Sequence, residues 1–182
     1  MAEMEVTDGK DSALPKMQNL HLPRILRLFR EPDKVWVRGE GWMPEILLAE
    51  DNPADVYLIR EALHEHGVDC PIRVVSDGRD VLRIISSEQP EEEAQDLGLI
   101  ILDLNLPRHD GIEILQKLRE TPRLAHVPVV VMTSSDSPRD HAMANSLGAT
   151  CYLRKPSRLD QFMSMGAVFK DLLGQAKTNS AV

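Results

Sequence analysis

From Pro44 onward, short apolar runs alternate with longer segments that are apolar on one side only. The runs are four to seven residues long and rich in Val, Ile and Leu, which is typical of strands. They predict strands at residues 45–50, 72–75, 97–103, 127–133 and 150–154. Between and after them, apolar residues recur at helical spacing, which predicts helices over residues 54–66, 78–87, a stretch that begins near 111, 137–147 and 159–173.

Residues that favour helix ends flank several of these segments. Asn52 is a good N-cap, and Pro53 suits the first helical position. Gly148 follows one predicted helix as a left-handed terminator, and Gly174 follows the last. Residues 44–174 therefore form one predicted domain.

Alternation of strands and helices is typical of α/β proteins. The runs at 97–103 and 127–133 are almost wholly apolar, as expected for parallel strands covered on both faces. Because right-handed crossovers restrict the connections, we predict a doubly wound, five-stranded parallel sheet with five helices, in three αβα layers.

The first 43 residues differ from the rest of the chain. They hold seven basic and seven acidic residues, and three prolines interrupt them. We expect residues 1–43 to be a disordered leader, or a non-native one if translation starts at Met43. Residues 175–182 are expected to form a flexible tail.

Composition excludes several classes of protein. Hydrophobic residues make up 42% of the 182 residues and charged residues 27%, which is typical of globular domains. The net charge of −8 argues against a basic nucleic-acid-binding surface, and no apolar run approaches the ~20 residues of a membrane span. Two cysteines without ligand spacing fit a reducing compartment. We therefore expect a cytoplasmic protein that binds neither nucleic acid nor a membrane.

Three motifs that are common in α/β enzymes are absent. No GxGxxG follows the first strand, and neither GxxxxGK[ST] nor GxSxG occurs. The six histidines are scattered without metal-site spacing. These absences disfavour a dinucleotide oxidoreductase, an NTPase and a serine hydrolase.

Polar residues follow the predicted strands at their carboxyl ends. Glu50 and Asp51 close the first strand, Asp103 the third and Thr133 the fourth, and Lys155 follows the fifth. If the first and third strands are neighbours, the three carboxylates converge at the switch point of the sheet. Their mutual repulsion favours a divalent cation, and hard oxygen ligands favour Mg²⁺.

This set of groups suits phosphoryl transfer. A carboxylate is already ionised at neutral pH and can act as the nucleophile that forms an aspartyl phosphate. The cation, the ammonium and the hydroxyl would then each interact with one phosphoryl oxygen.

Four segments in this order resemble the motifs of response regulator receiver domains of the CheY-like type: ILLAEDNPADVYLIREAL, LIILDLNLPRHDGIEIL, VVVMTSS and GATCYLRKP. The resemblance covers roughly residues 44–174 and implies the strand order 2-1-3-4-5. It implies that Asp103 is the phospho-acceptor, that Lys155 and Thr133 assist the reaction, and that Thr133 and Tyr152 form the conformational switch.

The resemblance also implies a set of metal ligands. These are Asp51, the Asp103 carboxylate and the backbone carbonyl of Asn105, with Glu50 acting directly or through water. In that family the bond between the lysine and the following proline is usually cis, so we expect a cis bond between Lys155 and Pro156.

The function implied is that of a single-domain response regulator in a two-component phosphorelay. A sensor histidine kinase or phosphotransfer protein would be the donor, and an unknown downstream protein the target, with homodimer formation left open. Such a domain catalyses only its own phosphorylation and dephosphorylation, so we do not class it as an enzyme. The residues of the first two motifs resemble those of regulators associated with bacterial phytochrome-type kinases. Two alternatives are a phospho-aspartate phosphatase of the haloacid dehalogenase type and an unphosphorylated pseudo-receiver.

Overall fold

The computed structural model describes residues 44–86 and 97–179. The expected leader over residues 1–43 lies outside the described residues, as do the segment 87–96 and the last three residues.

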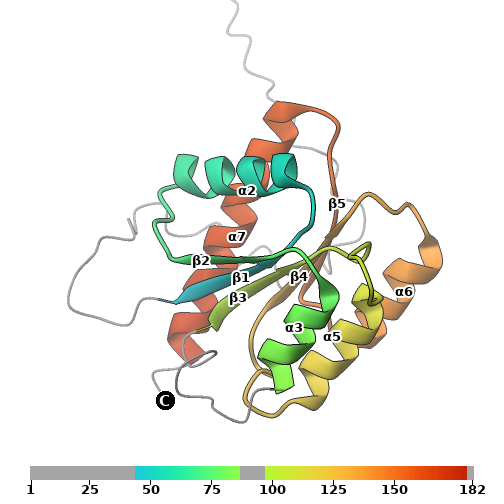
Figure 1. Cartoon of the computed structure of the whole chain (residues 1–182). Coiled ribbons are helices and arrows are strands. Elements are labelled where there is room, and N and C mark those ends of the chain that lie inside the picture. The colour runs from blue at the N-terminus through green and yellow to red at the C-terminus, as the bar shows by residue number, and fades with distance from the viewer. Residues whose placement is uncertain (1–43, 87–96, 180–182) are drawn as a thin grey trace, which may run out of the picture.

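Within the described residues, strands and helices alternate along the chain (Figure 1). The strands are β1 (Glu45–Ala49), β2 (Ile72–Val75), β3 (Leu97–Leu102), β4 (Val129–Thr133) and β5 (Cys151–Arg154). The helices are α2 (Pro53–Glu65), α3 (Gly78–Ser86), α5 (Gly111–Glu120), α6 (Pro138–Ser146) and α7 (Leu159–Asn179). The strands pair in parallel in the order β2-β1-β3-β4-β5, which confirms the predicted doubly wound sheet and its order.

The strand order brings the carboxyl ends of β1, β3 and β4 together. Ala49 of β1 pairs with Leu102 of β3, and the backbone N–H of Asp103 donates to the carbonyl of Ala49 at 3.0 Å. Leu102 also pairs with Val131 of β4. The residues that follow these strands therefore lie side by side, at the place where open α/β sheets bind ligands.

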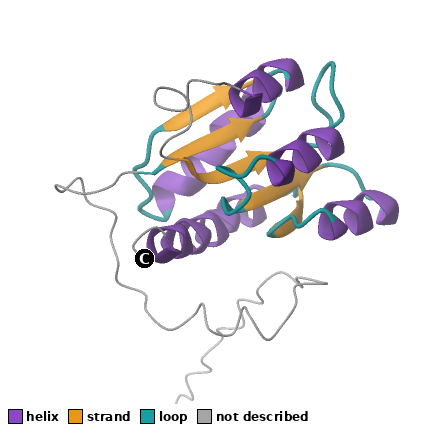
Figure 2. Cartoon of the chain, turned by 90° about the horizontal axis from the view of Figure 1, so that it is seen from below, coloured by secondary structure: helices purple, strands orange, loops and turns teal. Residues whose placement is uncertain are grey.

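Helices cover both faces of the sheet (Figures 1 and 2). Successive residues of β1 point to opposite faces: Ile46 and Leu48 pack with residues of α2 and α7, whereas Leu47 and Ala49 pack with residues of α3, α5 and α6. All four are fully buried. Burying a leucine or isoleucine side chain contributes roughly 1.5–3 kcal/mol to the stability of the fold. The alternation along β1 therefore helps to hold a helical layer on each face of the sheet.

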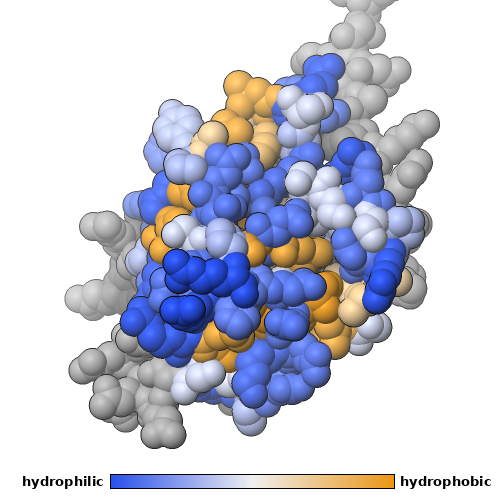
Figure 3. Space-filling view, turned by 45° about the vertical axis from the view of Figure 1, so that its right-hand side comes forward, coloured by the Kyte–Doolittle hydropathy of each residue, from blue (hydrophilic) through white to orange (hydrophobic). Residues whose placement is uncertain are grey.

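The face shown in Figure 3 is mostly hydrophilic, with smaller hydrophobic areas between the charged side chains. Among the helices of the described residues, none combines the length and the apolar character needed to cross a bilayer.

The predicted helix-end residues act as expected at two places. The side chain of Asn52 accepts a hydrogen bond from the backbone N–H of Ala54 at 3.0 Å, and Pro53 begins α2. Gly148 follows α6 with a φ of 84°, in the left-handed region that glycine adopts without strain.

Two predicted element bounds differ from the structure by more than one residue. Gly174 does not end the last helix, because α7 continues to Asn179; a glycine inside a helix costs about 1 kcal/mol relative to alanine, which a packed helix can tolerate. The fourth strand begins at Val129 instead of residue 127, because Val127 belongs to a turn in which its N–H donates to the carbonyl of Leu124 at 3.0 Å. The domain limit at residue 174 stays a prediction.

Candidate functional site

Three acidic side chains meet at the carboxyl end of the sheet, as the sequence predicts. Glu50 and Asp51 follow β1, and Asp103 follows β3. One carboxylate oxygen of each lies within 4.8 Å of the others. Glu50 and Asp103 are buried, at 2% and 4% exposed, whereas Asp51 is exposed. The cluster therefore has two buried members and one that faces solvent.

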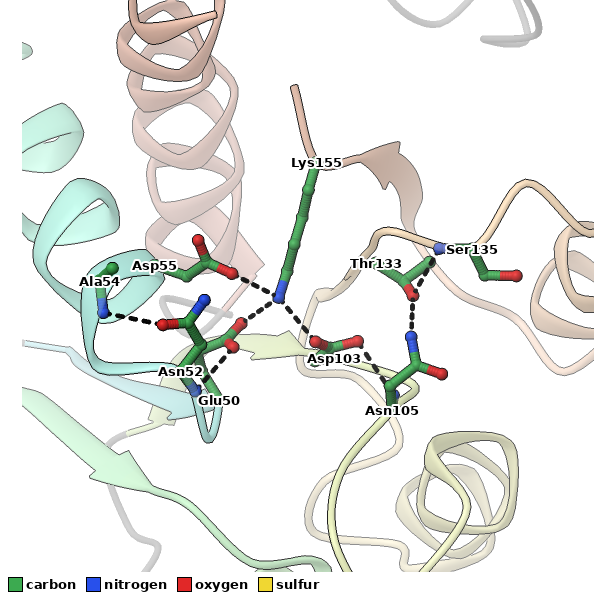
Figure 4. Close-up of polar contacts among 9 residues, drawn as sticks. All are labelled: Glu50, Asn52, Ala54, Asp55, Asp103, Asn105, Thr133, Ser135 and Lys155. Atoms are coloured by element: carbon green, nitrogen blue, oxygen red, sulfur yellow. Dashed lines mark hydrogen bonds and ion pairs between the residues drawn. The ribbon is translucent and has the colours of Figure 1, made fainter. Parts of the chain in front are cut away.

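The ammonium group of Lys155 joins this cluster from the loop after β5 (Figure 4). Its Nζ lies 2.6 Å from Oδ2 of Asp103, 2.7 Å from Oε2 of Glu50 and 2.9 Å from Oδ2 of Asp55. The lysine side chain is only 10% exposed. An ammonium has three N–H donors, so each carboxylate can receive one.

The environment shifts the pKa of both Lys155 and Glu50. Burial by itself lowers the pKa of Lys155, but the hydrogen bonds to Asp103, Glu50 and Asp55 together raise it above its ordinary value. Burial raises the pKa of Glu50, and this outweighs the opposite effect of Lys155. The two directions are compatible, because one ammonium is shared among three carboxylates.

The acidic cluster fits a divalent cation. Glu50, Asp51 and Asp103 supply hard oxygen ligands, and Asp55 adds a fourth carboxylate beside the single ammonium. Small divalent cations favour carboxylate oxygens, and such an ion would reduce the repulsion among these groups. Glu50, Asp51 and Asp103 are therefore the side chains that would hold it.

Asn105 lies beside Asp103, the predicted acceptor. Its backbone N–H donates to Oδ1 of Asp103 at 3.0 Å, and its side-chain Nδ2 donates to Oγ1 of Thr133 at 3.0 Å. The role of its backbone carbonyl as a metal ligand stays a prediction. Both oxygens of Asp103 thus have a defined donor, Asn105 at Oδ1 and Lys155 at Oδ2.

Thr133 ends β4 with its side chain fully buried. Its Oγ1 accepts hydrogen bonds from Nδ2 of Asn105 and from the backbone N–H of Ser135 at 3.2 Å. Within residues 44–86 and 97–179, no acceptor is recorded for its hydroxyl proton. Thr133 thus accepts in both hydrogen bonds, and its hydroxyl proton is available to a further acceptor.

Tyr152 of β5 lies near the segment that follows Thr133. Its hydroxyl is 3.5 Å from the carbonyl oxygen of Ser135, and its ring meets the ring of His141 edge-on, with centroids 4.8 Å apart. Burial raises the pKa of Tyr152, and the charges of nearby aspartates add to this. The predicted switch pair is thus connected through Ser135, which contacts both members.

The loop between β3 and α5 is held by contacts outside the cluster. A Cβ added at Gly111 would lie 2.5 Å from Cα of Leu104 and 2.8 Å from the carbonyl oxygen of Asp103, so only glycine allows this close approach. Arg108 adopts a φ of 72°, and its Nη1 lies 2.7 Å from Oδ2 of Asp77. These contacts fix the loop that begins at Asp103.

The expected cis bond between Lys155 and Pro156 is wrong: the described residues contain no cis peptide bond, so this bond is trans. Bonds to proline favour trans intrinsically by about 0.5–1 kcal/mol. The trans bond is compatible with the position of Lys155, whose backbone N–H donates to the carbonyl of Thr133 at 2.9 Å.

Sequence reasoning missed Asp55 as a site residue. Asp55 stands in the first turn of α2, where an acidic residue ordinarily stabilises the helix. Nothing in the linear pattern connects it with Lys155, which lies 100 positions away.

Comparisons with known proteins identify the family of this chain. The sequence profile described as "Response regulator receiver domain" matches residues 46–166. Response regulator Rcp1 of Synechocystis sp. is 35% identical over 120 residues, which cover 66% of this chain and 82% of Rcp1. The crystal structure of the phosphorylated cyanobacterial phytochrome response regulator RcpA is similar with a TM-score of 0.65 and 34% identity, covering 72% of this chain and 94% of that one. The Mn²⁺-bound form of Rcp1 is similar with a TM-score of 0.63 and 33% identity, covering 70% and 91%.

Proposed function

Because the chain belongs to the response regulator receiver domain family, we propose that it accepts a phosphoryl group on Asp103 and thereby changes its affinity for a partner protein. The observation that carries this proposal is the environment of Asp103. Its carboxylate is 4% exposed and receives Lys155 on one oxygen and the N–H of Asn105 on the other, and Glu50 lies within reach of the same ammonium.

The acceptor needs no general base. A carboxylate oxygen of Asp103 attacks phosphorus, a P–O bond forms, and the bond from phosphorus to the donor's leaving atom breaks. The new acyl phosphate places oxygens beside the ammonium of Lys155 and the free hydroxyl proton of Thr133. Each then stabilises charge on the transferred group.

The acidic cluster points to a cation requirement. We propose Mg²⁺, held by Glu50, Asp51 and Asp103 together with the carbonyl of Asn105. The similarity to the Mn²⁺-bound form of Rcp1 supports the binding of a divalent ion. When bound, the ion would offset the negative charge of the phosphoryl oxygens.

The phosphoryl group would alter the contacts of the switch pair. The hydroxyl of Thr133 would approach the phosphoryl group on Asp103, and its hydrogen bond to the N–H of Ser135 would then weaken. Because Tyr152 contacts the same Ser135, its ring can move into the space that is freed. The phosphoryl group shifts the equilibrium between the two arrangements of Thr133 and Tyr152 because it interacts more favourably with one of them.

The likeness to phytochrome response regulators supports a sensor histidine kinase or a phosphotransfer protein as donor. On this proposal the protein acts in the cytoplasm and catalyses only its own phosphorylation and dephosphorylation. Neither alternative from the sequence has support: the comparisons match receiver domains, and an acceptor with its lysine and threonine disfavours a pseudo-receiver.

The test uses the full chain with acetyl phosphate and Mg²⁺. We expect intact-mass spectrometry to show one added phosphoryl group in the wild type and none in Asp103→Asn, because the amide lacks an anionic nucleophile. Asp110→Asn is the matched control, since Asp110 is the N-cap of α5, where its side chain accepts from the N–H of Ile112, and asparagine caps equally well. Equal labelling of Asp103→Asn would overturn the proposal.

A further inference from the structure

Asp55 is a partly buried acidic residue that the proposed reaction does not use. It occupies the third position of α2, and its side chain is 18% exposed. At this helix position an acid often accepts a hydrogen bond from the N-cap backbone N–H. Here the N–H of Asn52 donates instead to Oε1 of Glu50 at 3.1 Å. The carboxylate of Asp55 is thereby left to contact the ammonium of Lys155.

The contact completes the coordination of Lys155. Asp103, Glu50 and Asp55 surround its Nζ at 2.6, 2.7 and 2.9 Å, so all three N–H donors have a charged acceptor (Figure 4). Two of these acceptors, Glu50 and Asp103, also belong to the acidic cluster that fits a cation. Asp55 does not belong to that cluster. It is the acceptor whose charge stays directed at Lys155 when the cluster is occupied.

Phosphorylation would change only one of the three contacts. Once Asp103 carries a phosphoryl group, its attacking oxygen loses its full charge, and the ammonium must transfer one hydrogen bond to a phosphoryl oxygen. A lysine has a flexible four-carbon side chain that does not fix the direction of its charge. Of the two remaining partners, Glu50 also belongs to the cluster that fits the cation, so Asp55 would determine where the ammonium lies.

We propose that Asp55 is a positioning residue for the phosphoryl transfer: it holds the ammonium of Lys155 at the acceptor oxygen of Asp103. This inference rests on the proposed function. Asp55 acts through Lys155: among the described residues its carboxylate pairs with that ammonium, and it is not one of the three clustered acids that would bind the cation.

The first arm of the test needs no phosphodonor. In ¹⁵N-labelled protein with Mg²⁺ at neutral pH, the NH₃⁺ signal of Lys155 should be visible, because a hydrogen-bonded, nearly buried ammonium exchanges slowly with water. Lys155→Ala assigns the signal. We expect it to be lost by exchange broadening in Asp55→Ala and retained in Asp80→Ala, which removes an exposed acid from the same position of α3. An unchanged signal in Asp55→Ala would overturn the proposal.

The second arm is a double-mutant cycle on the rate of labelling by acetyl phosphate. We expect Asp55→Ala to slow labelling about tenfold in the otherwise wild-type protein, since misplacing a catalytic group can lower the rate by up to about 10²-fold. In the Lys155→Ala background the same substitution should not slow labelling, because the group that Asp55 positions is gone. Slowing by the same factor in both backgrounds, or in neither, contradicts the proposal.

Asp55→Asn keeps the shape and one acceptor oxygen while it removes the charge, and we expect an intermediate rate and a weakened NH₃⁺ signal. It provides the same cycle if Asp55→Ala does not fold. If the wild type fails to label at all, the proposed function fails. If the wild type labels and the Asp55 variants match it, only the positioning role fails.

Discussion

The side-chain amide of Asn105 donates a 3.0 Å hydrogen bond to Oγ1 of Thr133, and this joins the loop after β3 to the end of β4. The same oxygen accepts the N–H of Ser135 at 3.2 Å, and the described residues offer no acceptor for its proton. In both bonds Thr133 acts as an acceptor, so its hydroxyl proton is available to a further acceptor.

Thr133→Ala should label at Asp103 but lose most of the conformational response. The substitution removes the donor that follows the phosphoryl group and leaves Tyr152 without its connection to the site. The measurement is the change in NMR shifts around Tyr152 when Mg²⁺ and beryllofluoride, a phosphoryl mimic, are added. Thr133→Ser is the control and should respond like the wild type, because it keeps the hydroxyl. Equal shift changes in Thr133→Ala and wild type would show that Thr133 does not transmit the signal.

The fold could be predicted from the sequence because local patterns and their alternation agree. The apolar runs are short, several helix ends carry cap residues, and right-handed crossovers leave few topologies. The convergence of Glu50 and Asp103 follows once β1 and β3 are neighbours, because both residues come directly after their strands. Site residues that directly follow a strand were thus predictable from the sequence.

Features that depend on how a helix packs, or on a single backbone torsion, were not predictable from the sequence. Asp55 contacts Lys155 because of the way α2 packs on the sheet, which residue spacing does not determine. The isomer of the Lys155–Pro156 bond depends on less than about 1 kcal/mol, within the range that tertiary contacts decide. Gly174 resembles a helix terminator in sequence, but α7 continues past it.

Gly166→Ala should lower the free energy of unfolding by roughly 1–3 kcal/mol, although alanine favours helices. Its Cβ would overlap the carbonyl oxygen of Ala62 and lie 2.5 Å from Nδ1 of His66, so α2 and α7 would have to separate. Gly174→Ala in the same helix is the control: nothing lies within 4 Å of its Cβ, and we expect a gain of about 0.5–1 kcal/mol. Urea unfolding measures both. Similar stabilisation by the two substitutions would contradict the close packing of α2 on α7.

Cys151 should resist alkylation in the folded protein. Burial raises its pKa from 9.0 to about 11, so only about one thiol in 1,000 is ionised at pH 8. Because the folded value lies above the unfolded one, the stability contributed by this thiol is complete below pH 9 and declines as the pH rises toward 11. Iodoacetamide and peptide mapping at pH 8 should modify the half-buried Cys70 first, and both cysteines in urea. Equal rates in the folded protein would contradict the burial of Cys151.

The central claim is that the phosphoryl group resides on the carboxylate of Asp103. Borohydride reduces an acyl phosphate, and it converts a phosphorylated aspartate to homoserine without affecting free carboxylates. After labelling with acetyl phosphate and Mg²⁺, peptide mapping should find homoserine at position 103 in wild type and at no position in Asp103→Asn. Homoserine at another aspartate, or a phosphate that survives acid on a hydroxyl side chain, would contradict the account.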